Sequence, residues 1–243
     1  MPMRSTGGVA GLACCALSAA MLVGCGPAPS DAGQGGLPAE PGPYTVTDLT
    51  SIATSIEGAG GPLQPVPTDR PRGSVDQLRQ LADRLAVEPA ACGDRITAGL
   101  DVDPEVLAAA PNVTLASGAG EDAATLTLMD ASPQSVRRLG GKAVGGTVFV
   151  ERAEAQRLLD GCTEVTLDPG TGSRVSLIRS LADADVLDAD QAYAVAAEAR
   201  LPRVTERQVT VSAVRGHLIA IASAADGAVA QRMAQQSLQQ APG

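Results

Sequence analysis

The sequence predicts an α+β fold, in which a twisted antiparallel sheet packs against helices that lie mainly on one of its faces. Three stretches within residues 191–222 alternate apolar and polar residues, as strands of an antiparallel sheet do. Other segments carry an apolar residue every three or four positions after a capping residue, as helices do. The chain is 44% hydrophobic with 2 Tyr, 1 Phe and no Trp, so we expect a core of Val, Leu, Ile and Ala.

Residues 1–24 have the pattern of a secretory signal peptide. Arg4 precedes an uncharged, mostly apolar stretch from Gly7 to Gly24 that is short for a membrane span, which needs about 20 apolar residues. The segment ends in Leu22-Val23-Gly24-Cys25, which resembles a bacterial lipobox. The resemblance implies cleavage before Cys25 and attachment of diacylglycerol, with a further acyl chain such as palmitate, to that residue. The alternative is an ordinary signal peptide with an incidental cysteine.

Residues 25–43 are expected to form the lipidated cysteine and a tether. The stretch after Cys25 reads GPAPSDAGQGGLPAEPGP, which has no apolar periodicity and too little apolar surface to fold. Fully extended, it would reach about 60 Å from the membrane. We expect a single α+β domain over residues 44–243, held by its lipid at the outer face of the cytoplasmic membrane.

Two cysteines besides Cys25 remain in the mature chain, and in an exported protein they most simply form one disulfide, Cys92–Cys162. The bridge would close a loop of about 70 residues and stabilise the fold by about 4 kcal/mol on the chain-entropy model. A bridge across the middle of the chain also favours one domain. The alternatives are two free thiols or a redox pair, although the chain has no CxxC motif.

Caps, apolar spacing and prolines predict the elements of the first half of the domain. Ser74 and Gln77 form a capping-box pattern, and Asp103 followed by Pro104 is a second helix start. In order, we expect a strand over 44–49, a loop over 58–73, a helix over 74–85, a helix over 104–110, a strand over 124–129, a helix over 133–139, a strand over 147–150 and a helix over 152–159.

Hairpins and a final helix are expected in the second half. A Pro- and Gly-rich turn joins strands at 163–167 and 174–178, and Arg215-Gly216 separates the last two of the strands at 191–199, 206–214 and 217–222. Val209 and Val211 alternate with Thr210 and Ser212, which predicts a sheet with one buried and one exposed face. Asp226 caps a helix whose apolar face contains Val229, Ala230, Met233, Ser237 and Leu238.

His217, the one histidine, is the obvious candidate for acid–base catalysis. It sits beside a hairpin turn, and the chain has no GxSxG nucleophile motif, so we interpret it as an exposed turn residue. A zinc site is also not expected, because one histidine and a disulfide leave only carboxylates as ligands.

The densest acidic cluster comprises Asp183, Asp185, Asp188 and Asp190. A calcium site is the alternative for these carboxylates. The central Gly and final Glu of an EF-hand loop are missing, so we expect a solvated loop. Gly118-Ala119-Gly120, Gly140-Gly141 and Gly145-Gly146 are expected to be turns, since no phosphate-loop motif is present. No metal and no cofactor is expected.

Charge and composition exclude nucleic acid as a partner. The net charge is −9, and three aromatic residues offer almost no stacking surface for bases. Asn112-Val113-Thr114 matches a glycosylation sequon, but a bacterial lipoprotein is not expected to be modified there.

The whole chain resembles an actinobacterial cell-envelope lipoprotein of the mycobacterial kind. The order of Cys92, Cys162-Thr-Glu-Val-Thr-Leu167, Asp190-Gln-Ala-Tyr-Ala-Val195 and Val209-Thr-Val-Ser-Ala-Val-Arg-Gly216 is similar to small lipoproteins related to the extracellular sensor domain of mycobacterial Ser/Thr kinases. The chain departs from those sensors in having one candidate disulfide, where they usually have two, and no kinase. The resemblance implies a twisted antiparallel sheet with helices and a non-enzymatic sensing or binding role, and it carries over no functional residue.

We therefore expect a non-enzymatic, lipid-anchored binding, sensing or accessory module whose partner is an envelope protein or a small apolar ligand. The first alternative is a carrier that holds a lipid or other apolar molecule between sheet and helices. The second is an enzyme that modifies envelope polymers, for which no pair of the 27 acidic residues can be singled out.

Overall fold

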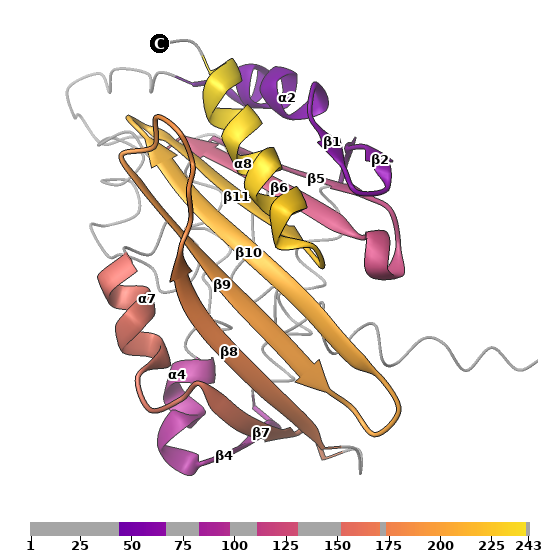
Figure 1. Ribbon diagram of the computed structural model, residues 1–243, viewed down its shortest axis with the longest axis vertical. Coiled ribbons are helices and arrows are strands. Elements are labelled where there is room, and N and C mark those ends of the chain that lie inside the picture. Colours follow the sequence, from indigo (N-terminus) through magenta and orange to yellow (C-terminus); the bar gives the residue numbers. More distant parts are fainter. Residues whose placement is uncertain (1–43, 67–82, 98–110, 131–151, 171–173, 242–243) are drawn as a thin grey trace, which may run out of the picture.

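A large antiparallel sheet forms the frame of the molecule. The computed structural model describes residues 44–66, 83–97, 111–130, 152–170 and 174–241. Nine strands pair in the order β3-β5-β6-β11-β10-β9-β8-β7-β4, and β1 and β2 form a separate small hairpin (Figure 1). The strands are β1 Glu57–Gly58, β2 Gly61–Pro62, β3 Gln64–Pro65, β4 Ala86–Glu88, β5 Asn112–Ser117, β6 Ala124–Asp130, β7 Glu164–Asp168, β8 Val175–Asp183, β9 Gln191–Arg200, β10 Thr205–Arg215 and β11 Leu218–Ala224.

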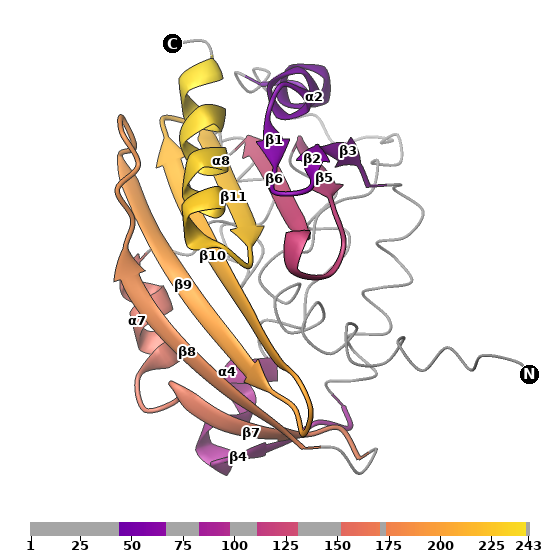
Figure 2. The same cartoon turned by 45° about the vertical axis from the view of Figure 1, so that its right-hand side comes forward.

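Helices lie against both faces of the sheet, at opposite ends. α8 (Gly227–Gln240) and α2 (Val46–Thr54) cover β10, β11, β6 and β5 on what we call the α8 face. α7 (Arg152–Leu159) and α4 (Gly93–Thr97) lie on the other face, the α7 face, beside β8 and β4 (Figure 2). Two short 3-10 turns, η1 (Ala90–Cys92) and η2 (Gly120–Asp122), complete the elements. An antiparallel sheet with helices packed on it confirms the predicted α+β fold.

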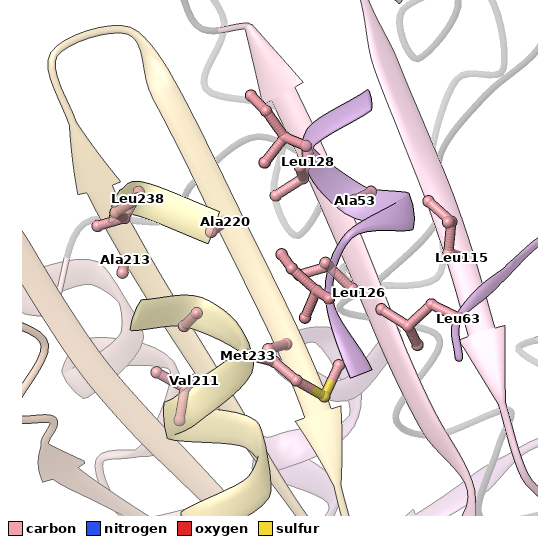
Figure 3. Packing of buried hydrophobic residues seen from close by; sticks show 14 of the residues in the cluster. Ala53, Leu63, Leu115, Leu126, Leu128, Val211, Ala213, Ala220, Met233 and Leu238 are labelled. Carbon is pink, nitrogen blue, oxygen red and sulfur yellow. The ribbon is translucent and has the colours of Figure 1, made fainter. Parts of the chain in front are cut away.

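The main core lies between the α8 face and the two helices on it. Leu126 and Leu128 of β6 belong to one buried cluster with Met233 and Leu238 of α8, and all four side chains are 0% exposed (Figure 3). Burying one such side chain stabilises the fold by about 1.5–3 kcal/mol. Small residues on β10 and β11 belong to the same cluster and let the helix approach the sheet closely: Ala213, Ala220, Ala222 and Ala224. As expected from the composition, this core is aliphatic.

The strand predicted at 44–49 is wrong, because those residues begin helix α2. The Thr45 side chain accepts a hydrogen bond from the Asp48 backbone at 3.2 Å, and the Asp48 carboxylate accepts one from the Thr45 backbone at 2.8 Å. Leu49, Ile52 and Ala53 then form the buried stripe of the helix. The alternation of Val46 with threonines suggested a strand, but this capping box and the buried stripe favour the helix.

The region between α2 and α7 is only partly described. Short strands β1 to β3 occupy the start of the predicted loop, and β5 is a strand that we did not predict. The predicted helix at 74–85 lies outside the described residues up to 82, while Leu85 precedes strand β4 rather than ending a helix. The predicted elements at 104–110, 133–139 and 147–150 lie outside the described residues, and the strand at 124–129 and the helix at 152–159 are confirmed.

The hairpins and the final helix are confirmed in the second half of the chain. β7 pairs with β8, and β9, β10 and β11 are consecutive antiparallel neighbours. The last turn lies one residue later than predicted, since Arg215 pairs with Leu218 and leaves Gly216 and His217 as the connection. The Asp226 side chain accepts a hydrogen bond from the Ala228 backbone at 2.8 Å and so caps α8.

The prediction that the Thr210 and Ser212 side of the sheet faces solvent is wrong. Thr210 is 7% exposed and Ser212 is 6% exposed, although they alternate with Val211 as expected. Alternation reports which residues share a face, but whether that face is covered depends on the rest of the fold. The polar side of the central strands is therefore part of the interior.

Candidate functional site

The disulfide lies on the α7 face and joins two segments that are distant in the sequence. Cys92 ends η1, Cys162 lies just beyond α7, and the two sulfur atoms are joined at 2.05 Å across a sequence separation of 70. The bridge packs in a small apolar cluster with residues of β4, β7, β8 and β9: Val87, Ile96, Val165, Leu167, Val175, Leu177 and Ala199. The predicted pair is therefore joined, and the alternatives of free thiols or an open redox pair do not describe this structure.

Arg179 lies next to this cluster and is the most unusual side chain on the α7 face. It occupies β8 in the same alternating phase as Leu177 and Leu181, and it is 8% exposed. Its Nη2 donates to the carbonyl oxygen of Cys162 at 2.8 Å, and its backbone N–H donates to the carbonyl oxygen of Thr163 at 2.6 Å. The charged side chain thus stands where the strand pattern calls for an apolar one.

The described residues around Arg179 are mostly apolar and hold no counter-charge for it. The disulfide cluster lies on one side, and a second cluster around Tyr193 and Val195 lies on the other. Among the described residues no carboxylate forms an ion pair with Arg179, and its Nε is buried without a hydrogen-bond partner. Burial lowers the pKa of Arg179 to about 10, which still leaves it protonated at neutral pH.

A second arginine, Arg95 of α4, satisfies the C-terminal end of α7. Its Nη1 donates to the carbonyl oxygen of Arg157 at 3.2 Å and to that of Asp160. A cation near exposed carbonyls at a helix C-terminus is favourable, because the helix dipole is negative there. Arg95 is exposed, so its charge remains solvated, unlike that of Arg179.

The α7 face continues as a band of hydroxyl groups across the central strands. Thr114 and Thr127 share a hydrogen bond at 3.0 Å, and Thr210 and Ser223 share one at 2.8 Å. The neighbouring Tyr193 is paired with Ser212 in register; burial raises the pKa of its hydroxyl and the hydrogen bond between the two side chains opposes that rise. These are separate hydrogen-bonded pairs, each of which satisfies polar groups on the covered face of the sheet.

The four aspartates of the predicted acidic cluster have separate surroundings, and all four are exposed. Asp183 Oδ1 lies 2.8 Å from Nε of Arg152 in α7, with which it forms an ion pair. The Asp190 side chain accepts a hydrogen bond from the Gly216 backbone N–H at 2.7 Å. Asp188 has φ of 62° in the turn of the loop. In the described ranges no group of three or more His, Cys, Asp or Glu side chains is arranged to hold a metal ion. The structure gives the calcium alternative no support.

The backbone of the same loop is held by helix α8. Gln231 Nε2 donates to the carbonyl of Asp185 at 2.6 Å, and Gln235 both accepts from the Leu187 backbone at 2.5 Å and donates to its carbonyl at 3.3 Å. Val186 points into the main core at 8% exposure. The loop is therefore docked on the helix, with its carboxylates in solvent.

The remaining candidates fall where the sequence placed them or outside the described residues. His217 is exposed in the β10–β11 turn, and Gly118 and Gly120 lie in the turn between β5 and β6. Asn112 lies in β5 and is 7% exposed, which disfavours a sugar there. The lipidation candidate Cys25 and the turns at 140–141 and 145–146 lie outside the described residues. No helix in the described part of the chain is long and apolar enough to span a membrane.

Sequence reasoning missed Arg179 and the hydroxyl band. A signal for Arg179 was present, because an arginine interrupts the apolar phase of Val175, Leu177 and Leu181 in an alternating strand. The hydroxyl band had no comparable signal, since threonine and serine are ordinary residues on the solvated side of a strand.

Comparisons with known proteins name no family for this chain. No family model matches it, and no curated protein matches it. Among solved structures it is similar to the X-ray structure of an uncharacterised protein from Mycobacterium smegmatis, the Rv0999 ortholog, with 15% sequence identity and a TM-score of 0.41, over 64% of this chain and 75% of that one. A likeness of this degree supports no statement about family or function.

Proposed function

We propose that this chain is a non-enzymatic binding or accessory module, anchored by a lipid on Cys25 to the outer face of the cytoplasmic membrane. The observation that carries the proposal is the cysteine arrangement. Cys92 and Cys162 are bonded to each other, which leaves Cys25, at the end of the lipobox-like segment, as the cysteine of the expected mature chain available for a lipid. Stable disulfides also belong to compartments outside the cytoplasm.

The surroundings of His217 favour a binding role over catalysis. The side chain is exposed in a hairpin turn and has no hydrogen bond or ion pair with a described residue. A histidine that acts as a general base is normally oriented by a third group and lies within reach of a nucleophile. An enzyme built on His217 therefore has no support.

The carrier alternative has no support on the α8 face. An apolar ligand between sheet and helices would occupy the space that Leu49, Leu126 and Met233 fill at 0% exposure. Apolar pockets that hold ligands are open clefts of roughly 300 Å³ or more. We therefore propose that binding takes place on the α7 face or on the outer surface.

The sensing role is the finer part of the proposal. The chain is similar in its motif order to lipoproteins related to the extracellular sensor domain of mycobacterial Ser/Thr kinases, whose implied role is sensing or ligand binding. A sensing module of this kind would pass its signal to a partner in the envelope.

Lipidation tests the proposal directly. The full-length gene is expressed in an actinobacterial host, and the N-terminal peptide of the membrane-associated protein is analysed by mass spectrometry. We expect a peptide that begins at Cys25 and carries diacylglycerol with an additional acyl chain, and a protein that partitions into the detergent phase of a two-phase extraction.

The matched control is Cys25→Ala, which we expect to carry no lipid on the residue at position 25. An unmodified Cys25 on a protein released into the medium would overturn the anchor. An activity on envelope polymers that is lost on changing one carboxylate would overturn the non-enzymatic role.

A further inference from the structure

We propose that Arg179 is the binding group of an anion subsite on the α7 face, which takes the carboxylate or phosphate oxygens of a ligand. The proposal rests on the binding role proposed above and names the chemistry of what is bound. It is carried by the position of Arg179, by the donors it leaves unused and by the groups around it.

The position is a costly one for a cation. Arg179 is the basic residue among the described ones whose side chain is buried, between clusters around Leu177 and around Tyr193. A buried charge that no opposite charge compensates destabilises the folded state, and an apolar side chain of similar size would fill the same place without that cost. The observed arginine therefore needs a compensating partner.

The described residues supply only part of that compensation. A guanidinium has five N–H donors. The side chain of Arg179 uses Nη2 on the carbonyl of Cys162, and its Nε is buried without a partner. By contrast, other arginines have a carboxylate within 4.0 Å, namely Arg152, Arg174, Arg200 and Arg207. Arg95 and Arg215 also donate to carbonyl oxygens, but neither is buried, so among the described arginines Arg179 combines burial with the lack of a carboxylate partner.

Two neighbours do not compete for the charge of Arg179. Arg95 already satisfies the carbonyls of Arg157 and Asp160 at the end of α7, so that helix end does not need Arg179. On the neighbouring strand β9, the residue paired with Arg179 is Ala197. Its methyl group is half-buried and offers no polar partner. Only a small apolar group therefore stands beside the guanidinium on that strand.

The chemistry of the side chain selects the ligand class. A planar guanidinium binds carboxylate and phosphate oxygens through parallel N–H donors, and such charge-assisted bonds are about twice as strong as neutral ones. In an apolar surrounding the attraction is stronger still. The ligand is thus an oxyanion, which a free small molecule or a lipid headgroup can supply.

The test uses the full-length protein purified in a non-ionic detergent. Inorganic phosphate, acetate, and the short-chain lipids dihexanoyl phosphatidylglycerol and dihexanoyl phosphatidylcholine are titrated separately at constant ionic strength, with calorimetry and the thermal unfolding midpoint as readouts. We expect saturable binding of phosphate or acetate and a rise in the midpoint, since a ligand that binds only the folded state stabilises it.

Two variants assign the binding to the site. In Arg179→Met, which keeps the length and apolar stem, the Kd for the bound anion should rise by about tenfold or more. Arg95→Met is the matched control, because Arg95 contacts the same helix end but is exposed. It should lower the unfolding midpoint slightly and leave the Kd unchanged.

The two lipids distinguish the sources of the anion. Phosphatidylglycerol binding more than about tenfold tighter than phosphate, with the same loss in Arg179→Met, identifies a lipid headgroup. Equal binding of phosphate and phosphatidylglycerol identifies a free oxyanion. Both results support the subsite. Binding of phosphatidylcholine that is independent of Arg179 would contradict it.

A direct readout keeps the proposal falsifiable if Arg179→Met does not fold. The Arg179 Nε–H signal of the wild-type protein, assigned by its absence in Arg179→Lys, should shift as phosphate or acetate is added. No shift and no change in the midpoint at any anion concentration would overturn the subsite. The lipid on Cys25 is read by mass spectrometry from the same sample, so failure of the anchor and failure of the anion subsite give separate results.

Discussion

At the scale of single residues, backbone conformation and charge pairing impose the sharpest constraints. Gly118 has φ of 68°, and a Cβ there would lie 2.2 Å from the carbonyl oxygen of Asp122. Glu198 lies between two arginines on the exposed part of the α8 face. Each feature leads to a measurable consequence.

Replacing Gly118 by alanine should lower the free energy of unfolding by more than the backbone strain of a left-handed alanine alone would cost. A left-handed conformation costs an alanine about 1–2 kcal/mol, and the clash with Asp122 should add roughly 1–3 kcal/mol in urea unfolding. Gly170→Ala is the matched control, because Gly170 has φ of 73° and no described residue lies within 4 Å of the added Cβ. An equal loss of unfolding free energy in the two variants would show that the turn after β5 rearranges to accommodate the new methyl group.

Glu198 should make stability depend on pH in the acid range. Its carboxylate accepts from Arg200 Nε at 2.7 Å and Arg207 Nε at 2.8 Å, and these hydrogen bonds hold the pKa of Glu198 below its ordinary value of 4.5. The pKa is lowered in the folded state, so the contribution to stability is present above 4.5 and is lost as the pH falls through the lowered pKa.

The comparison of wild type with Glu198→Gln isolates this effect. We expect the variant to be the less stable protein at neutral pH, with the difference shrinking as the pH falls below 4.5. Urea midpoints across this range measure it, and about 1 M salt should reduce the difference at neutral pH because the side chains of both arginines are exposed. A difference that stays constant down to the lowest pH would argue against the assigned pairing.

At the scale of elements, helix α8 does most to bury the α8 face of the sheet. Its apolar stripe packs on β10 and β11, and its glutamines Gln231 and Gln235 hold the β8–β9 loop. The helix therefore fixes both a core and a loop that are distant from it in sequence. Local capping by Asp226 starts it, but tertiary packing supplies most of its stability.

Met233→Ala should reveal how much of that stability comes from packing. The side chain is 0% exposed in the middle of the main core, so its truncation should cost about 2–5 kcal/mol. Gln236→Ala, on the exposed side of the same helix, should change stability by at most about 0.5 kcal/mol. Urea unfolding followed by circular dichroism checks both, and a small loss for Met233→Ala would mean that the core closes around the gap.

At the scale of the whole molecule, one covalent link connects the segment before β5 to the segment after α7. The Cys92–Cys162 bridge joins residues 70 apart and lies among apolar residues at the β4 edge of the sheet. The edge strand β4 has only three residues, so the bridge and its cluster hold this end together.

Removing the bridge should destabilise the whole fold. Replacing both Cys92 and Cys162 by alanine should cost about 2–5 kcal/mol, mainly through the greater freedom of the unfolded chain. A reductant should lower the urea midpoint of the wild type and leave that of the double variant unchanged. If the reductant shifts both proteins equally, its effect does not come from this bond.

Predictability from the sequence differed between parts of the chain for physical reasons. The hairpins from 191 to 222 and helix α8 were predicted because alternation, a tight turn and the Asp226 cap act over a few residues. Residues 44–49 were misassigned because Thr45 and Thr47 suit a strand as well as a cap, and the choice depends on burying Leu49 and Ile52. Strand β5 was missed because its pairing with β6, more than its own pattern, identifies it.

The sequence by itself determined the features that depend on neighbouring residues: the lipobox-like pattern from Leu22 to Cys25, the pair of cysteines that can form one bridge, and the alternation that puts Val211 and Ser212 on opposite faces. The tertiary structure decided which residues cover those faces and which charges they contact. It buried Ser212, gave the aspartates of the 183–190 segment separate contacts, and placed Arg179 against the Cys162 carbonyl with no carboxylate beside it among the described residues. Burial and charge pairing are set by segments far apart in the chain, and local spacing carries little information about them.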